Sequence, residues 1–534
     1  MAEEKREGRK IFGIRPMLLL FAAEYMMQGL ANPFQAITNQ PFFKHFHMHY
    51  GLDEAATQGL FARSYLAWSF KPVIGFVVDA LGKTKLILLV LLGTATLGFA
   101  LSPLLDFGPG AFFWTMFALA VVLACTDVVV DRATVVEGDE EAKQTGKSKA
   151  ATVGLNQAIC WIAVYGTGMF AMFAGGWVAE NVALHTLLVA LAIVPAIVFC
   201  IALLLPADRA AAIPLGRSIR NFWVGLNTGP LLWIILFYFL FHFQPQGSAI
   251  WNAYLIDTLH FSQTQIGYSD GTAYAGYLVG TIAFARWGLP LQDKIGLKRL
   301  FTIFIPACAV CVLTQLLLVD PTFTRLTNAI AGVVPVPVER VRLAALCLQQ
   351  FFLYGTQGFV RMSTFSLVGV VVPAAAAGSL FAGFMSVANL AYSFSYSTGS
   401  WLYAHGMEYA FVARLQMAIF GVPANEQGEM SIAMLTLLWS VSYFLSFLVI
   451  QKVPDEKETR SSEDVQMANA ESLARLGPSL LLGVNVLTVL AMVTLAAFLS
   501  LELDQDPIAS VILSFFACAL LRKVFLDSRV AALA

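Results

Sequence analysis

The sequence predicts an all-α polytopic membrane protein made of two six-helix halves and an additional C-terminal two-helix hairpin. Three observations lead to this fold class: the composition, apolar segments of membrane-spanning length, and a turn motif that occurs in both halves. The 534 residues are 58% hydrophobic and 13% charged, whereas soluble domains carry about 25% charged residues. The composition excludes a soluble enzyme, a nucleic-acid-binding protein and a disordered chain, because a soluble protein of this length needs charged side chains to cover several domains.

Apolar segments long enough to cross a bilayer recur along the whole chain. A membrane-spanning helix needs about 20 mostly apolar residues. The first candidate follows a charged arm and has polar residues at its centre, so we interpret it as a span and not as a signal peptide. The fourteen candidate spans are residues 15–37, 57–80, 84–104, 111–133, 149–176, 184–205, 229–256, 264–287, 298–319, 343–371, 376–403, 430–451, 478–500 and 507–524.

The basic residues predict how these spans are oriented. With a cytoplasmic N-terminus, 25 Lys and Arg residues fall in cytoplasmic segments, five fall outside and three lie within spans. Such a bias is what the positive-inside rule expects. We therefore expect both termini in the cytoplasm, and the short loops without a transit peptide favour a bacterial inner (plasma) membrane.

One turn motif follows both the second and the eighth span. The segments GFVVDALGK (75–83) and LPLQDKIGLKR (289–299) each contain an acid, a glycine three residues later and basic residues. An intracellular turn of this kind in each half resembles the major facilitator superfamily, whose two six-helix halves rock about a central site. The predicted units are a cytoplasmic arm (1–14), the N-terminal six-helix half (15–205), a linker (206–228), the C-terminal six-helix half (229–451), a second linker (452–477), and the hairpin with its tail (478–534).

Polar and charged side chains within the spans are the candidate substrate-binding residues. Ionisable groups at bilayer depth cost about 2.5–3.5 kcal/mol each on insertion scales, so each is a functional candidate. Some follow helical spacing, as Glu24 does with Gln28, and the seventh span is interrupted by HFQPQG (242–247). The expected substrate-binding residues are Glu24, Gln28, Lys71, Asp127, Gln357, Arg361 and Asn389.

A second group of charges lies near the predicted cytoplasmic ends of the spans. These residues are expected to form a structural gate and not a substrate site, because they belong to the turn motifs or to the end of the fourth span. The expected gate residues are Asp79, Lys83, Asp131, Arg132, Glu137, Asp293 and Lys294.

We predict no metal site and no cofactor. The alternation of His45, His47 and His49 in the first external loop favours a surface segment. Cys308 and Cys311 lie in an apolar run without a second pair, which favours helix packing. All seven cysteines lie in apolar runs, so a disulfide framework is not expected.

Several of these stretches together resemble the folate-biopterin transporter family within the major facilitator superfamily. The resemblance covers about 20–451, and its most specific part is the pattern W-x-x-K-P-x-x-G-x-x-x-D at 68–79. Residues 127–137 and 373–389 and the pair Gln28-Gly29 also match. The sequence departs from the family at Arg132, where alanine is usual, in PAAAAG, which lacks an acid, and in the extra hairpin.

The resemblance implies a secondary active transporter that moves a folate or a pterin by alternating access, with protonation of Glu24 or Asp127 as the coupling step. A carboxylate can accept two hydrogen bonds from a pterin ring, and Arg361 or Lys71 can pair with a folate tail.

Two alternatives stay open: a transporter of S-adenosylmethionine or another amphipathic metabolite, and a non-transporting member that assists assembly or handles pigments. The chain has no motif of a membrane enzyme. The expected partners are a small-molecule substrate, protons and the lipid bilayer, with no nucleic acid, and the expected state is a monomer.

Overall fold

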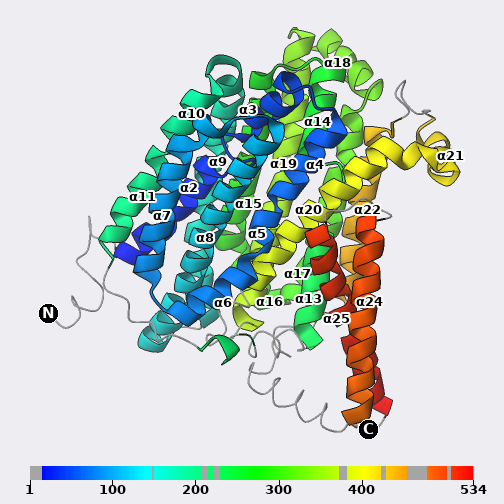
Figure 1. Cartoon of the computed structure of the whole chain (residues 1–534). Helices are drawn as coiled ribbons and strands as arrows, with labels where there is room; N and C mark the ends of the chain where they lie inside the picture. Colours follow the sequence, from blue (N-terminus) through cyan, green and yellow to red (C-terminus); the bar gives the residue numbers. More distant parts are fainter. Residues whose placement is uncertain are drawn as a thin grey trace.

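The computed structural model is almost entirely helical (Figure 1), and no described residue lies in a β-strand. The structure describes residues 15–146, 149–205, 214–217, 219, 229–371, 382–421, 429–453, 478–501 and 507–532. The prediction of an all-α chain is confirmed. The arm at 1–14 and most of both predicted linkers lie outside the described residues.

The first half extends from α2 to α11 and has its own apolar core. Its elements are α2 (Pro16–Ala31), α3 (Asn39–Phe43), η1 (Lys44–His49), α4 (Glu54–Ser64), α5 (Leu66–Ser69), α6 (Lys71–Leu81), α7 (Thr84–Leu101), η2 (Ser102–Leu105), α8 (Pro109–Thr145), α9 (Lys149–Asn181), α10 (Leu184–Leu191) and α11 (Ile193–Leu203).

The second half extends from α13 to α22 and contributes most of a separate apolar core. Its elements are α13 (Gly229–Phe241), α14 (Ser248–Ala253), η3 (Tyr254–Thr258), α15 (Gln263–Ala283), η4 (Phe284–Gly288), α16 (Leu289–Ile295), α17 (Leu297–Leu313), η5 (Thr314–Leu318), α18 (Thr322–Val333), α19 (Val338–Val371), α20 (Ala382–His405), η8 (Gly406–Glu408), α21 (Ala410–Phe420) and α22 (Ile432–Ile450).

Several predicted spans differ in detail from the observed helices. The span predicted at 57–80 is divided into α4, α5 and α6, and Pro72 lies in the first turn of α6, where a proline without an N–H is tolerated. Helix α8 continues to Thr145, well beyond the predicted end. The predicted interruption of the seventh span is observed, because α13 ends at Phe241 and α14 begins at Ser248.

Both glycines of the repeated turn motif adopt positive φ angles. Gly82 ends α6 with φ 61°, and Gly296 separates α16 from α17 with φ 81°. Glycine adopts these conformations without the steric cost of a Cβ atom. The two turns lie at the same end of the helix bundle, near α6 and α16 in Figure 1. We call the opposite end, which carries η1 and α18, the external end, after the predicted orientation.

Within the described residues, seven helices are long and apolar enough, by length and composition, to cross a membrane. The other predicted spans are shorter, broken or richer in polar side chains. Helices can cross a bilayer because their backbone N–H and C=O groups are hydrogen-bonded within the helix. Several apolar helices of this length therefore indicate an integral multi-pass membrane protein.

The two halves approach closely along α15, which packs against α9 of the first half and α19 of the second. A Cβ atom at Gly280 of α15 would lie 2.1 Å from the carbonyl oxygen of Gly355 on α19, and one at Gly176 of α9 would lie 2.2 Å from the carbonyl oxygen of Gln263. Small residues allow such backbone contacts between membrane helices. These contacts bring polar side chains of both halves to a common centre.

The C-terminal hairpin lies at the side of the second half. Helices α24 (Pro478–Leu501) and α25 (Pro507–Ala532) pack on each other, and α25 contacts α13 and α20. Figure 1 shows the pair, in orange and red, beside α22 and extending beyond the other helices at the lower end. None of the described residues of the hairpin lines the central cavity described below.

Candidate functional site

A cavity of about 240 Å³ lies between the two halves, and polar and aromatic side chains from both of them form its walls. Five of the seven predicted substrate-binding residues line it: Gln28, Lys71, Asp127, Arg361 and Asn389. The other two lie behind this wall. Glu24 is covered by Gln28, and Gln357 lines a smaller neighbouring cavity.

The side-chain amide of Gln28 links two buried carboxylates. Its Nε2 donates to both carboxylate oxygens of Glu24 at 2.8 Å and to Oδ1 of Asp127 at 2.6 Å. The Thr126 hydroxyl also donates to Glu24, at 3.1 Å. The predicted helical spacing of Glu24 and Gln28 therefore produces a direct contact, and both donors to Glu24 are neutral.

Lys71 pairs with two aspartates of α8. Its ammonium donates to Oδ2 of Asp127 and lies 3.8 Å from Oδ2 of Asp131, and it also lies over the ring of Trp68 at 5.2 Å. The three charged side chains are at most 3% exposed. Tyr25 donates to Asp131 at 2.6 Å. Asp131 therefore lies beside Lys71 and Tyr25, and its expected role in the gate stays a prediction.

We call Glu24, Lys71, Asp127 and Asp131 the acid cluster. Three carboxylates in it share one ammonium group. Burying an unpaired charge is costly, so the cluster is stable when a carboxyl carries a proton or when a further cation binds.

Arg361 on α19 is surrounded by hydrogen-bond acceptors and aromatic rings. Its guanidinium donates to Nε2 of His242 at 3.2 Å, to the Tyr165 hydroxyl at 2.9 Å and to the Tyr392 hydroxyl at 3.2 Å. It also lies 5.4 Å from the ring centre of Trp161 and 5.6 Å from that of Tyr277. Among the described residues Arg361 forms no ion pair with a carboxylate, so its positive charge is available to an anion.

The hydrogen bonds around His242 fix its tautomer. A guanidinium only donates, so Nε2 of His242 accepts from Arg361. Nδ1 lies 2.9 Å from the carbonyl oxygen of Tyr238, which only accepts, so Nδ1 carries the proton. His242 is therefore a neutral imidazole that orients Arg361. The interruption of the seventh span at 242–247 places it there.

The remaining predicted residues occupy different environments. Gln357 accepts a hydrogen bond from Tyr277 at 2.9 Å, and Asn389 donates to the Met385 carbonyl within its own helix at 3.1 Å. In the predicted gate, Arg132 donates to Asp79 at 2.9 Å, and both side chains are buried.

The other predicted gate residues differ in their exposure. Glu137 is half-buried, whereas Lys83 and Lys294 are exposed. The side chain of Asp293 lies outside what the structure describes. The role of all these residues as a gate stays a prediction.

Asp270 on α15 lines the central cavity but is absent from the residues predicted as a site. Its carboxylate accepts from the Gln40 amide at 2.9 Å, and it forms no ion pair with a lysine or arginine in the described part of the chain. The sequence could have identified Asp270, because an aspartate within an apolar span is a functional candidate by its depth alone.

A cluster at the external end contains His45, one of the three alternating histidines. Asp106 accepts from Tyr50 and lies 3.2 Å from His45 and 3.4 Å from His185. Burial raises the pKa of Asp106, but the bond from Tyr50 and the two imidazoles outweigh burial, so its pKa lies below the ordinary 3.8. Burial lowers the pKa of His45 below 6.5. These residues stabilise the external end.

The fold has clear relatives among solved structures, although no family model and no curated protein matches the sequence. The human organic anion transporter MFSD10 (TETRAN) has a TM-score of 0.52 at 13% identity, covering 82% of this chain and 97% of that one. A bacterial homologue of the iron transporter ferroportin has a TM-score of 0.52 at 15% identity, covering 82% and 98%. The D-xylose-proton symporter has a TM-score of 0.53 at 13% identity, covering 84% and 99%.

The chain has the major facilitator fold. The predicted fold is therefore confirmed, since almost the whole of each of these transporters aligns with this chain. Identities this low establish the fold alone. The resemblance to the folate-biopterin transporter family stays a prediction.

Proposed function

We propose that this protein is a secondary active transporter that moves a pterin or a folate across the membrane by alternating access, coupled to protons. The observation that carries the proposal is the central cavity, which is lined by Arg361, without a carboxylate partner among the described residues, and by Lys71 and Asp127 of the acid cluster. The major facilitator fold supports a role in transport.

The charges around the cavity favour a substrate with a planar ring and an anionic group. Arg361 fits the anionic group, because Lys71 is already paired with two aspartates. Tyr165 and Tyr277 stack with their ring centres 4.9 Å apart, which provides an aromatic wall beside Arg361. Asp270 can accept the ring N–H and the exocyclic amine of a pterin together.

The size of the cavity favours a pterin over a whole folate. Ligand pockets usually measure about 300–1,000 Å³, and this one measures about 240 Å³. A bicyclic ring fills such a space, whereas a folate also needs room for its benzoyl-glutamate tail.

The acid cluster supports proton coupling. Glu24 receives hydrogen bonds only from neutral groups, Gln28 and Thr126, among the described residues. Protonation of Glu24 removes one acceptor of Gln28, which directly contacts the cavity residue Asp127. A proton on Glu24 therefore changes the hydrogen bonding of the cavity wall, which is the link that coupling requires.

Uptake by proteoliposomes that contain the purified protein tests this proposal. A labelled pterin should accumulate under an imposed inward proton gradient with no membrane potential, and co-transport of one proton supports about tenfold accumulation for each pH unit, since one pH unit contributes about 1.4 kcal/mol per proton. Glu24→Gln should abolish the accumulation. Glu141→Gln, which changes a carboxylate of the same half outside the cavity, should not.

The outcomes separate the parts of the proposal. Uptake that depends neither on the proton gradient nor on Glu24 would refute proton coupling but would leave the proposal of transport intact. Absence of any pterin or folate uptake or binding would refute the substrate.

The excess of acid around the cavity also favours a second candidate, S-adenosylmethionine, whose sulfonium such carboxylates attract. Unlabelled pterin that fails to compete with labelled S-adenosylmethionine would support it. Stoichiometric pigment or a protein partner in the purified sample would instead favour the non-transporting alternative.

A further inference from the structure

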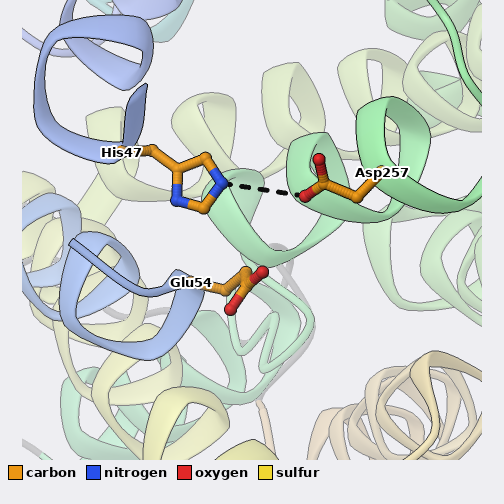
Figure 2. Close-up of side chains that lie close together, drawn as sticks. All are labelled: His47, Glu54 and Asp257. Carbon is orange, nitrogen blue, oxygen red and sulfur yellow. Dashed lines mark ion pairs between the residues drawn. The ribbon is translucent and has the colours of Figure 1, made fainter. Parts of the chain in front are cut away.

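We propose that His47, Glu54 and Asp257 bind a divalent first-row transition-metal ion of the Zn²⁺ type at the external end, where the ion connects the two halves. Figure 2 shows the three side chains facing one another, with His47 and Glu54 on segments of the first half and Asp257 on a helix of the second. The inference does not depend on the identity of a transported substrate.

The three ligand atoms are close enough for one ion. One atom from each residue lies within 4.8 Å of the others, and Nε2 of His47 lies 3.7 Å from Oδ2 of Asp257. Ligands of tetrahedral zinc, each at roughly 2.0–2.1 Å from the metal, are about 3.3 Å apart. Small side-chain rotations therefore convert this arrangement into a coordination site with room for water as a fourth ligand.

His47 is already held in the orientation that metal binding requires. Its Nδ1 lies 2.7 Å from the carbonyl oxygen of Leu52, which only accepts, so Nδ1 carries the proton. The lone pair of Nε2 then faces Asp257. Metal-binding histidines usually donate their second ring N–H to a carbonyl or carboxylate in this way.

The other two histidines of the same segment have different partners. His45 lies beside Asp106, and the ring of His49 stacks on His45 with centres 4.9 Å apart. The three histidines alternate regularly in the sequence, but they have different contacts in the structure. His47 alone of the three belongs to the group with Glu54 and Asp257.

The local charge is negative, which attracts a cation. Glu54, Asp257 and Glu429 all interact electrostatically with the Tyr403 hydroxyl. Glu54 and Asp257 form no ion pair with a lysine or arginine within the described ranges. Asp53 is engaged as the N-cap of α4, where it accepts from the Ala56 N–H, so Glu54 is the acid that faces the group.

The ligand set selects the class of ion. An imidazole nitrogen suits zinc and related first-row metals better than calcium or magnesium, which prefer all-oxygen sites, and the absence of a thiolate from the three-residue group disfavours copper(I). The side chain of Asp257 is 53% exposed and that of His47 17% exposed, so an ion can enter from solution.

A bound ion would join the halves beside contacts that already close this end. Ser400 donates to the Ala55 carbonyl at 2.8 Å. The Gln58 side chain accepts from the Ala249 N–H at 2.9 Å. Both hydrogen bonds link the two halves. The ion adds a further link at the same end, so it should stabilise the folded protein against heating.

Zn²⁺ titration of the full-length protein, purified in detergent and stripped with EDTA, tests the site. We expect one ion per chain and a Tm that rises with Zn²⁺ concentration. His47→Ala, Glu54→Gln and Asp257→Asn should each weaken Zn²⁺ binding by at least about tenfold, given that even outer-shell changes cost 10–100-fold. Mn²⁺ should bind more weakly, and Mg²⁺ should not compete.

Two matched variants serve as controls. His49→Ala removes a histidine of the same segment, and Glu408→Gln removes an exposed acid that lies 3.1 Å from His405 in the second half. Both should bind Zn²⁺ like the unchanged protein, and each variant's rise in Tm with Zn²⁺ is measured against its own metal-free Tm. Absence of Zn²⁺ binding, binding that survives all three ligand substitutions, or a preference for Mg²⁺ would overturn the proposal.

Discussion

The buried ion pair between Asp79 and Arg132 allows a quantitative prediction. The Arg132 guanidinium lies 2.9 Å from the Asp79 carboxylate, and the two side chains are 8% and 2% exposed. Solvent therefore screens the pair little, and removing one partner leaves the other buried charge without this ion pair. Breaking a buried pair in this way costs about 3–5 kcal/mol. Asp79→Asn and Arg132→Gln should each lower the free energy of unfolding by that amount.

The double variant and a second ion pair make the prediction specific. Asp79→Asn with Arg132→Gln leaves no buried charge at this place, so it should cost less than the sum of the single changes by about 2 kcal/mol or more. The pair of Arg15 and Glu141, at 3.0 Å, is 33% and 20% exposed. Arg15→Gln should cost at most about 1 kcal/mol, as pairs accessible to solvent do.

Unfolding in mixed detergent and SDS micelles, followed by circular dichroism, measures these differences. Single-variant costs below about 1 kcal/mol, with an additive double variant, would refute the reasoning that burial sets the strength of this pair. Equal costs for Arg15→Gln and Arg132→Gln would refute it as well.

Three further predictions follow from contacts described above. Gly280→Ala should destabilise the protein by roughly 1–3 kcal/mol, because the new Cβ meets the Gly355 backbone at 2.1 Å. Gly59→Ala in the interior of α4 meets nothing within 4 Å, so it should not lower the Tm. Acidification should lower the Tm, because the pKa values of His45 and Asp106 are both lower in the folded protein than in the unfolded chain. The stability that they contribute is lost as the pH falls below 6.5 for His45 and below 3.8 for Asp106. A Tm that rises in acid would contradict this. Arg361→Lys should weaken pterin binding about 10–100-fold, because lysine keeps the charge but loses the three-way donor geometry, whereas the exposed Arg286→Lys should not, as equilibrium binding can verify.

The helices follow from the sequence because apolar segments of about 20 residues give a strong signal. The break between α13 and α14 was also predictable, since Pro245 and Gly247 disrupt helical hydrogen bonding. The divisions at Tyr65 and Phe70 were not, because aromatic residues within an apolar run give no local sign of a break. Pro72 alone marks the start of the last segment.

The contacts within one half were more predictable than those between halves. Glu24 and Gln28 are one turn apart, and the spacing alone places them side by side. Asp131 lies one turn after Asp127 on the same face, which explains why it also lies close to Lys71. The bond from Arg361 to Tyr165 depends on how the halves pack, and no spacing in the sequence encodes it.

The acid cluster and Arg361, the two charged groups at the central cavity, respond differently to a relative motion of the two halves. Every residue of the acid cluster belongs to the first half, so its bonds survive such a motion. Arg361 belongs to the second half, and its bond to Tyr165 and its contact with Trp161 cross to the first. Motion of the halves must break these cross-half contacts while those to His242 and Tyr392 persist. A ligand that binds Arg361 in place of Tyr165 therefore lowers the cost of separating the halves at this point. In the transport cycle that we propose, the arginine would act in movement as well as in binding.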